Sequence, residues 1–249
     1  MQTIKMIVLY SLVFIAQGSY HAVQAKGNLI TDSIYATSLE GNILGDPVKR
    51  ELMVYLPPGY ETSAKQYPVI YLLHTGGGNA GFYPNNVFPP LLEVTGMFTK
   101  PQDFPEEGFV SLMDSLIIKG KIHPLILVMP DINSAYGGSF CVNSALNGNY
   151  EDYVVNDLVA FTDSKYRTLL NRNSRAIAGH CMGGYGATYL AMKYPDVFGA
   201  MAGHSPELCL DALARACQPY IAAENPEGIS GPDPTKPFTG FMYMFSAPP

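Results

Sequence analysis

The chain is predicted to fold as a single α/β domain, with a mostly parallel sheet and helices on both faces. Continuous apolar runs recur along the chain, and stretches with helical periodicity separate them, which is typical of strands buried under helices. The length of 249 residues suits one sizeable domain. Hydrophobic residues make up 47% and charged residues only 14%, a composition that excludes a disordered chain.

The expected elements follow from local patterns. Segments 29–37 and 48–56 alternate apolar and polar residues, so we expect two antiparallel strands at one edge of the sheet. Buried strands are expected at 68–73 (PVIYLL), 125–129 (LILVM), 175–179 (RAIAG) and 198–203. Helices are expected at 108–119, 150–166 and 183–194, with irregular connections at 81–105 and 133–149.

Residues 1–25 are predicted to be a secretory signal. Lys5 supplies a positive start, 6–16 form a short apolar run, and Val23 and Ala25 are small residues at the cleavage positions. A membrane anchor is the alternative, but the run is too short for a bilayer core of about 30 Å. The mature chain is therefore expected to begin near Lys26, to be secreted or periplasmic, and to have no membrane span after cleavage.

Composition and cysteine spacing argue against nucleic-acid, metal and cofactor binding. The net charge of −6 and the lack of a basic run argue against nucleic acid. The four cysteines Cys141, Cys181, Cys209 and Cys217 match no metal-ligand spacing, so neither metal nor cofactor is expected. Cys209 and Cys217 fall in one predicted helical stretch of about 12 Å, so they could form a disulfide only if that helix breaks.

A strand, a tight turn and a helix meet at Gly179-His180-Cys181-Met182-Gly183. This pattern predicts a nucleophile elbow, in which two glycines let strand and helix approach and the central side chain is exposed. At the helix N-terminus the dipole is expected to favour a thiolate and to lower the pKa of Cys181. The alternative is a buried structural cysteine, but a second glycine loop favours the nucleophile.

That second loop is His74-Thr75-Gly76-Gly77-Gly78, directly after a buried strand. It is expected to bring a backbone N–H of Thr75 or Gly76 toward the nucleophile, where it forms an oxyanion hole with the N–H of Met182. A phosphate-binding loop is the alternative, but neither GxxxxGK[ST] nor GxGxxG is present. His74 is expected to be structural.

These motifs resemble the esterase family of α/β-hydrolases that includes esterase D-like, feruloyl-esterase-like and mycolyltransferase-like enzymes. The resemblance is carried by PPGY (57–60), YLLH and its glycines (71–78), LILVMPD (125–131), YGGSF (136–140), NYEDYVVNDL (149–158) and AGHCMGGYGA (178–187). It implies an α/β-hydrolase fold, a nucleophile at Cys181 and oxyanion donors at Met182 and at Thr75 or Gly76. Most relatives have Ser at the nucleophile position, although dienelactone-hydrolase-like enzymes use Cys.

The resemblance also implies an acid and a histidine after the nucleophile. The only histidine past Cys181 is His204, near Glu207. These two residues are interpreted either as local packing at a strand end or as a substitute base and its orienting partner. Residues 26–249 are therefore expected to form one α/β-hydrolase domain that is incomplete at its C-terminus and lacks its last strands.

For three further polar side chains, the sequence predicts supporting or structural roles. His180 is expected to point away from Cys181, and Asp131 to line the pocket at a strand end. Glu151, in the first turn of a predicted helix, is explained by the helix dipole.

Taken together, the residues predict an exported hydrolase of a small-molecule or carbohydrate-linked carboxylic ester. A non-catalytic homologue that binds an ester or carbohydrate is the alternative, because the base is missing and the nucleophile is altered. A thiol oxidoreductase is disfavoured because Cys181 has no nearby partner cysteine. The identity of the ester and the oligomeric state do not follow from the sequence.

Overall fold

The structure is a computed structural model that describes residues 26–84, 108–135, 137–145, 147–209, 211 and 215. The predicted signal segment, most of 81–105 and Cys217 lie outside the described residues.

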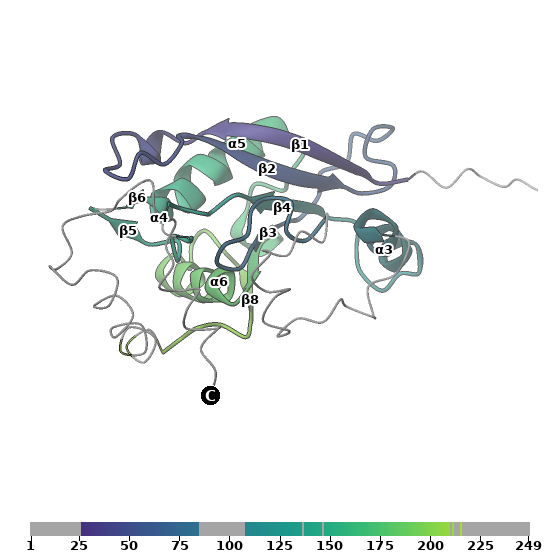
Figure 1. Cartoon of the computed structure of the whole chain (residues 1–249). Coiled ribbons are helices and arrows are strands. Elements are labelled where there is room, and N and C mark those ends of the chain that lie inside the picture. Colours follow the sequence, from purple (N-terminus) through teal and green to yellow (C-terminus); the bar gives the residue numbers. More distant parts are fainter. Residues whose placement is uncertain are drawn as a thin grey trace, which may run out of the picture.

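A six-stranded sheet forms the centre of the molecule, in the order β1-β2-β4-β3-β7-β8 (Figure 1). Its strands are β1 (Asn28–Tyr35), β2 (Lys49–Leu56), β3 (Val69–Leu73), β4 (Ile126–Pro130), β7 (Arg175–His180) and β8 (Ala200–His204). β1 pairs antiparallel with β2, and β2 antiparallel with β4. β3, β4, β7 and β8 are mutually parallel. The predicted mostly parallel sheet with an antiparallel edge is confirmed.

The continuous apolar runs occupy the middle of this sheet. Val69 in β3 lies opposite Ile126 of β4 and Arg175 of β7, so β3 is hydrogen-bonded on both sides. The strand expected at 198–203 is present as β8, but the expectation that it is buried is wrong. All of its residues are exposed, because β8 lies at one end of the sheet and, among the described helices, only α6 (Met182–Lys193) packs against it, where a Cβ at Gly203 would lie 2.8 Å from Oγ1 of Thr188.

Helices cover both faces of the sheet. They are α3 (Gly108–Ile118), α4 (Tyr150–Asp152), the π-helical segment η2 (Tyr153–Leu158), α5 (Val159–Lys165) and α6 (Met182–Lys193), with short 3₁₀ turns η1 (Thr37–Leu39) and η3 (Arg172–Ser174). The helix expected at 150–166 is present, but its middle is π-helical, which apolar periodicity does not reveal. The loop expected at 133–149 also contains a two-stranded hairpin, β5 (Asn143–Ser144) with β6 (Gly148–Asn149).

Alternate residues of the strands face two separate cores. In β2, Tyr55 packs in a smaller cluster with Leu127, against α3. Its neighbour Val54 belongs to the larger cluster, which also holds Tyr153 of η2 and Leu190 of α6. This period of two places α3 on one face of the sheet and the other helices on the opposite face, as predicted.

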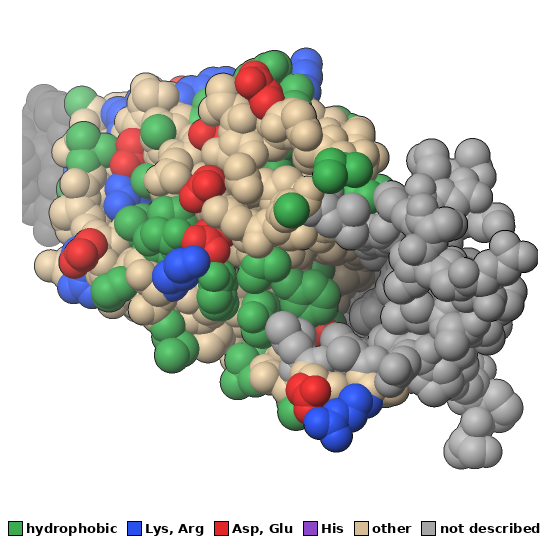
Figure 2. All heavy atoms as spheres, turned by 90° about the vertical axis from the view of Figure 1, so that its left-hand side faces the viewer, with side chains coloured by type: hydrophobic (Ala, Val, Ile, Leu, Met, Phe, Trp, Pro, Cys, Tyr) green, Lys and Arg blue, Asp and Glu red, His purple; other side chains and the backbone are tan. Residues whose placement is uncertain are grey.

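Parallel strands bring their carboxyl ends to the same edge of the sheet. The ends of β3, β4 and β7 therefore carry His74, Asp131 and Cys181 to that edge. On the molecular face shown in Figure 2, acidic and basic side chains are scattered among hydrophobic ones over the described atoms. Among the described residues, none of the helices combines the length and apolar character needed to cross a bilayer.

Candidate active site

Cys181 is the single residue that connects β7 to α6, and it has a backbone conformation that L-residues rarely adopt. Its φ is 55° and its ψ is −119°. A Cβ at Gly179 would lie 2.3 Å from the backbone of Gly183, and a Cβ at Gly183 would lie 2.2 Å from the carbonyl oxygen of Leu73. Only glycine fits at both places, so the strand, the turn and the helix have the geometry expected of a nucleophile elbow.

The sulfur of Cys181 has three polar neighbours from three different segments. The side chain of Thr75 and the backbone N–H of Met182 hydrogen-bond it. The thiol itself donates to Oε1 of Glu207, at a Sγ–Oε1 distance of 3.4 Å. The structure thus brings together four of the predicted site residues at the carboxyl edge of the sheet.

The pKa of Cys181 shifts opposite to the expected direction. Burial raises the pKa of the thiol above its ordinary value, and the charge of Glu207 and its hydrogen bond raise it further. Hydrogen bonds from Thr75 and Met182 lower the pKa without reversing the shift. The expectation that the helix dipole lowers this pKa is therefore wrong in its net direction. The thiol needs a proton acceptor before it can attack.

The glycine loop after β3 lies against the elbow. Gly78 N–H donates to the carbonyl of Thr75 (3.1 Å), and Gly77 N–H donates to the carbonyl of Gly137 (2.5 Å). A Cβ at Gly138 would lie 2.1 Å from the sulfur of Met182 and 3.8 Å from Cα of Gly76. The predicted oxyanion segments, 75–76 and Met182, therefore meet around the 137–138 turn.

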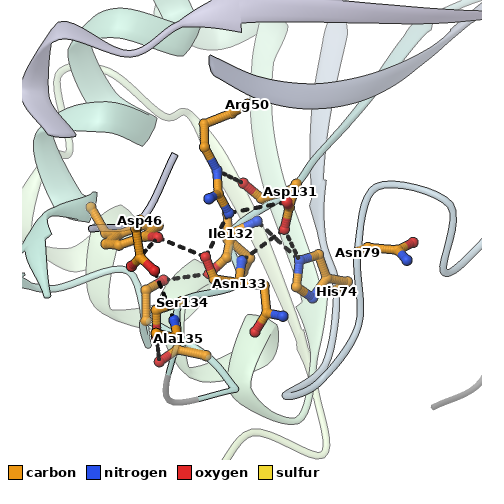
Figure 3. Close-up of polar contacts among 12 residues, drawn as sticks. Asp46, Arg50, His74, Asn79, Asp131, Ile132, Asn133, Ser134 and Ala135 are labelled. Carbon is orange, nitrogen blue, oxygen red and sulfur yellow. Dashed lines mark hydrogen bonds and ion pairs between the residues drawn. The ribbon is translucent and has the colours of Figure 1, made fainter. Parts of the chain in front are cut away.

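His74, at the start of this loop, faces Ile132 and Asp131 of the segment after β4 (Figure 3). The backbone N–H of Ile132 can only donate, so Nε2 of His74 accepts it at 2.9 Å. The ring proton then sits on Nδ1, which donates to the carbonyl of Thr75 at 2.7 Å. Both nitrogens are engaged in holding backbone, so His74 is structural, as predicted.

Asp131 supports the same loop rather than lining an open pocket. Its Oδ2 pairs with the buried guanidinium of Arg50 at 3.1 Å, and its Oδ1 lies 3.5 Å from Nε2 of His74. Burial raises the pKa of Asp131, but the charge of Arg50 and the N–H of Asn133 outweigh burial and lower the pKa. Asp131 is thus a carboxylate at neutral pH and anchors the loop through Arg50.

The network continues away from the elbow along the segment after β4 (Figure 3). Arg50 also donates to the carbonyl of Asn133 (2.5 Å). The hydroxyl of Tyr150 lies 2.6 Å from that carbonyl oxygen and 2.8 Å from Oδ2 of Asp46, so its single proton is shared between the two acceptors. Asp46 accepts the N–H of Ala135 at 2.8 Å. These bonds fix the path of the chain that carries the 137–138 turn.

His204 and Glu207, predicted as a possible base and orienting pair, separate in the structure. The ring of His204 contacts the ring of His180, with centroids 5.2 Å apart, and its backbone carbonyl accepts the N–H of Cys181 at 3.0 Å. Burial and the charge of His204 lower the pKa of His180. Of the predicted pair, Glu207 is the residue whose side chain reaches the sulfur.

Tyr83 is a site residue that sequence reasoning missed. Its hydroxyl donates to the carbonyl of Leu73 at 2.9 Å, at the end of β3. Burial raises its pKa, a hydrogen bond with the backbone of His180 opposes this, and the charge of Cys181 raises it further. Tyr83 therefore lies beside the elbow, in a segment whose composition predicted only irregular connection.

Among the described residues, no group of three or more His, Cys, Asp and Glu side chains is arranged to hold a metal ion. The chemistry available at this edge is that of a thiol, a carboxylate, hydroxyls and backbone N–H groups.

Comparison with known proteins shows the family to which the chain belongs. The family model named Esterase, described as "Putative esterase", matches residues 46–213. The chain is 33% identical over 153 residues to the esterase Rv1288 of Mycobacterium tuberculosis, covering 61% of this chain and 28% of that protein. It is 31% identical over 196 residues to an endo-1,4-beta-xylanase/feruloyl esterase of Xylanibacter ruminicola, covering 71% of this chain and 23% of that protein.

The fold matches solved structures as well. A ferulic acid esterase superposes with a TM-score of 0.53 at 25% identity, covering 74% of this chain and 59% of that one. An S-formylglutathione hydrolase from Staphylococcus aureus superposes with a TM-score of 0.53 at 17% identity, covering 89% of this chain and 75% of that one. The chain spans less than a third of the length of the two curated relatives.

Proposed function

Because the chain belongs to the esterase family, we propose that it hydrolyses a carboxylic ester through an acyl-thioester on Cys181. The observation that carries this proposal is the position of the Cys181 sulfur. It projects from a strained turn at the start of α6, against the N–H of Met182 and the side chain of Thr75. An acyl carbonyl attacked there would have its oxygen beside backbone donors.

The reaction has two halves. In acylation, Sγ of Cys181 bonds to the acyl carbon, and the negative oxygen of the tetrahedral intermediate accepts hydrogen bonds from the N–H of Met182 and of Thr75 or Gly76. The C–O bond then breaks and the alcohol leaves. In deacylation, water bonds to the acyl carbon, the C–S bond breaks, and the carboxylic acid leaves.

The proposed substrate is a small-molecule or carbohydrate-linked ester. The relative from Xylanibacter ruminicola is named a xylanase and feruloyl esterase, which makes a feruloyl ester the first substrate to try. Two aromatic residues lie beside the elbow: the hydroxyl of Tyr83 donates to the carbonyl of Leu73, and the backbone N–H of Tyr185 donates to the carbonyl of Cys181. These rings suit an aromatic acyl group or a sugar.

We further propose that the protein is exported. Lys5 followed by the apolar run 6–16 and the small residues Val23 and Ala25 supports a cleaved signal. Expression in a bacterial host with the whole chain should yield a periplasmic or extracellular product that begins near Lys26, as read by N-terminal sequencing. A product that retains Met1 in the cytoplasm would contradict export.

Hydrolysis of an activated acetate ester and of a methyl ferulate probe tests the catalytic proposal. We expect Cys181→Ala to abolish both activities, whereas Cys209→Ala, which removes an exposed cysteine, should leave them unchanged. Equal activity in Cys181→Ala and the parent chain would contradict a nucleophilic Cys181.

One observation favours a second candidate function, a homologue that binds an ester without turnover. The sulfur of Cys181 contacts the carboxyl group of Glu207, which follows β8. The ring of His204, the predicted base, contacts His180 instead. Saturable binding of methyl ferulate without release of ferulate, and without acylation of Cys181, would establish this second function.

A further inference from the structure

The carboxyl group of Glu207, a half-buried residue just beyond β8, faces Cys181. Oε1 lies 3.4 Å from Sγ. Oε2 is buried and makes no hydrogen bond within the described part of the chain. A buried carboxylate oxygen without a partner is costly, so its presence beside a thiol needs an explanation.

The backbone fixes Glu207 to the elbow. The pairing of His180 with His204 joins β7 to β8, and the N–H of Cys181 donates to the carbonyl of His204. Ser205 has a φ of 44°, which turns the chain after β8. A Cβ at Gly184 would lie 3.2 Å from Cα of Pro206, so this turn packs on the first turn of α6. The strand pairing and this turn therefore position Glu207 beside the sulfur of Cys181.

Other groups around the sulfur are unsuited to accept its proton. His74 uses one ring nitrogen on Ile132 and the other on Thr75. The imidazoles of His180 and His204 contact one another. Tyr83 donates its proton to Leu73, and burial raises its pKa. Thr75 is a neutral hydroxyl. Glu207 is the remaining acceptor among the described groups that face the thiol.

We propose that Glu207 is the general base of this site and serves both halves of the reaction. This inference rests on the proposed function and adds to it a proton acceptor within the described residues. The reaction would then turn over without an imidazole.

Each proton transfer balances. In acylation, the thiol proton moves to Glu207 while the S–C bond forms, and Glu207 then gives that proton to the departing alkoxide as the C–O bond breaks. In deacylation, Glu207 takes a proton from water while the new C–O bond forms. It then gives the proton to the Cys181 thiolate as the C–S bond breaks. The carboxylate ends in its starting state.

The variant Glu207→Gln keeps the size of the side chain and removes the base. We expect kcat to fall by about 100-fold or more, the scale of general-base catalysis, and the acid limb of the kcat–pH profile to disappear. Glu61→Gln, an exposed carboxylate in the loop after β2, is the matched control and should leave kcat and the profile unchanged. Thermal unfolding verifies that both variants fold.

Alkylation by neutral iodoacetamide separates a catalytic role from a structural one. Glu207 raises the pKa of Cys181 through its charge and hydrogen bond, so Glu207→Gln should speed alkylation of Cys181 at pH 7 while slowing ester turnover. Because a disordered site would also expose the thiol and speed its alkylation, the rates are compared only if Glu207→Gln unfolds at the same temperature as the parent chain. Opposite changes support the proposal, and parallel losses overturn it.

Single-turnover kinetics distinguishes this inference from the proposed function. If acyl-Cys181 forms in the parent chain but Glu207→Gln hydrolyses it at the same rate, Glu207 is not the base and the nucleophile still stands. If the folded parent chain forms no acyl-Cys181, the proposed function itself fails.

Discussion

At the scale of single residues, the sequence predicted the shape of the site better than its electrostatics. Gly179 and Gly183 around Cys181 predicted a strained elbow, and the structure confirms it, because steric limits at a tight turn depend on neighbouring residues alone. The pKa of Cys181 depends on Glu207, which is separated from it along the chain by helix α6 and strand β8. Spacing alone does not say which way that side chain turns.

The elbow leads to a prediction about Gly183. A Cβ there would press on the carbonyl oxygens of Leu73 and His74, at 2.2 and 2.5 Å, and neither backbone atom can rotate away. Gly183→Ala should therefore lower the free energy of unfolding by about 1–3 kcal/mol and displace the Met182 N–H from the sulfur. Urea denaturation and the rate of Cys181 acylation measure the two effects.

Gly186→Ala is the control on the same helix. Its Cβ would meet the side chain of Cys141, 2.9 Å from Sγ, and alanine favours the helix by about 1 kcal/mol over glycine. It should therefore lose less stability than Gly183→Ala. Equal acylation and stability in Gly183→Ala and the parent chain would refute the packing argument.

At the scale of elements, strands and helices were predictable from apolar patterns, but the contacts between them were not. The sequence explains Glu151 by the dipole of its own helix. In the structure it also binds α6, accepting hydrogen bonds from Tyr189 (2.8 Å) and Tyr194 and pairing with Lys193 (2.7 Å). These partners are 38–43 residues away, beyond the reach of periodicity.

The network that joins β2, β4 and the glycine loop gives an element-scale prediction. Asp131→Asn leaves the buried Arg50 without its charged partner, which should cost about 3 kcal/mol of unfolding free energy at pH 7. It should also slow acylation, because His74 then holds Thr75 less firmly. Asp196→Asn, at an exposed carboxylate, should change neither.

The same variant has a defined pH dependence. The pKa of Asp131 is lower in the folded protein than the value of about 3.9 for an unfolded chain. Its contribution to stability is therefore complete above that unfolded value and is lost as the pH falls through the folded one. Urea denaturation of parent and variant should converge in acid. A difference that grows as the pH falls would contradict the ion pair.

At the scale of the whole molecule, composition and the alternation of strands and helices predicted the α/β sheet. They did not predict that β8 would be exposed, because a run such as 198–203 looks the same at the centre and at the end of a sheet. Strand order depends on pairing between distant segments.

Hydrogen exchange should follow this strand order. Amides of β3, bonded on both sides and buried, should exchange slowest, and amides of β8 and β1 at the two ends should exchange faster. Exchange mass spectrometry of peptides from the native protein measures this gradient. Protection of β8 equal to that of β3 would show that the described arrangement is incomplete at this edge.

The central claim is that Cys181 is an acyl acceptor, and intact-mass analysis tests it most directly. The purified chain and Cys181→Ala are exposed to an activated acetate ester and sampled over time. We predict a single acetyl adduct that requires Cys181 and then decays, with a slower decay in Glu207→Gln. The absence of any Cys181-dependent adduct on a folded protein would contradict the account and favour a binding role.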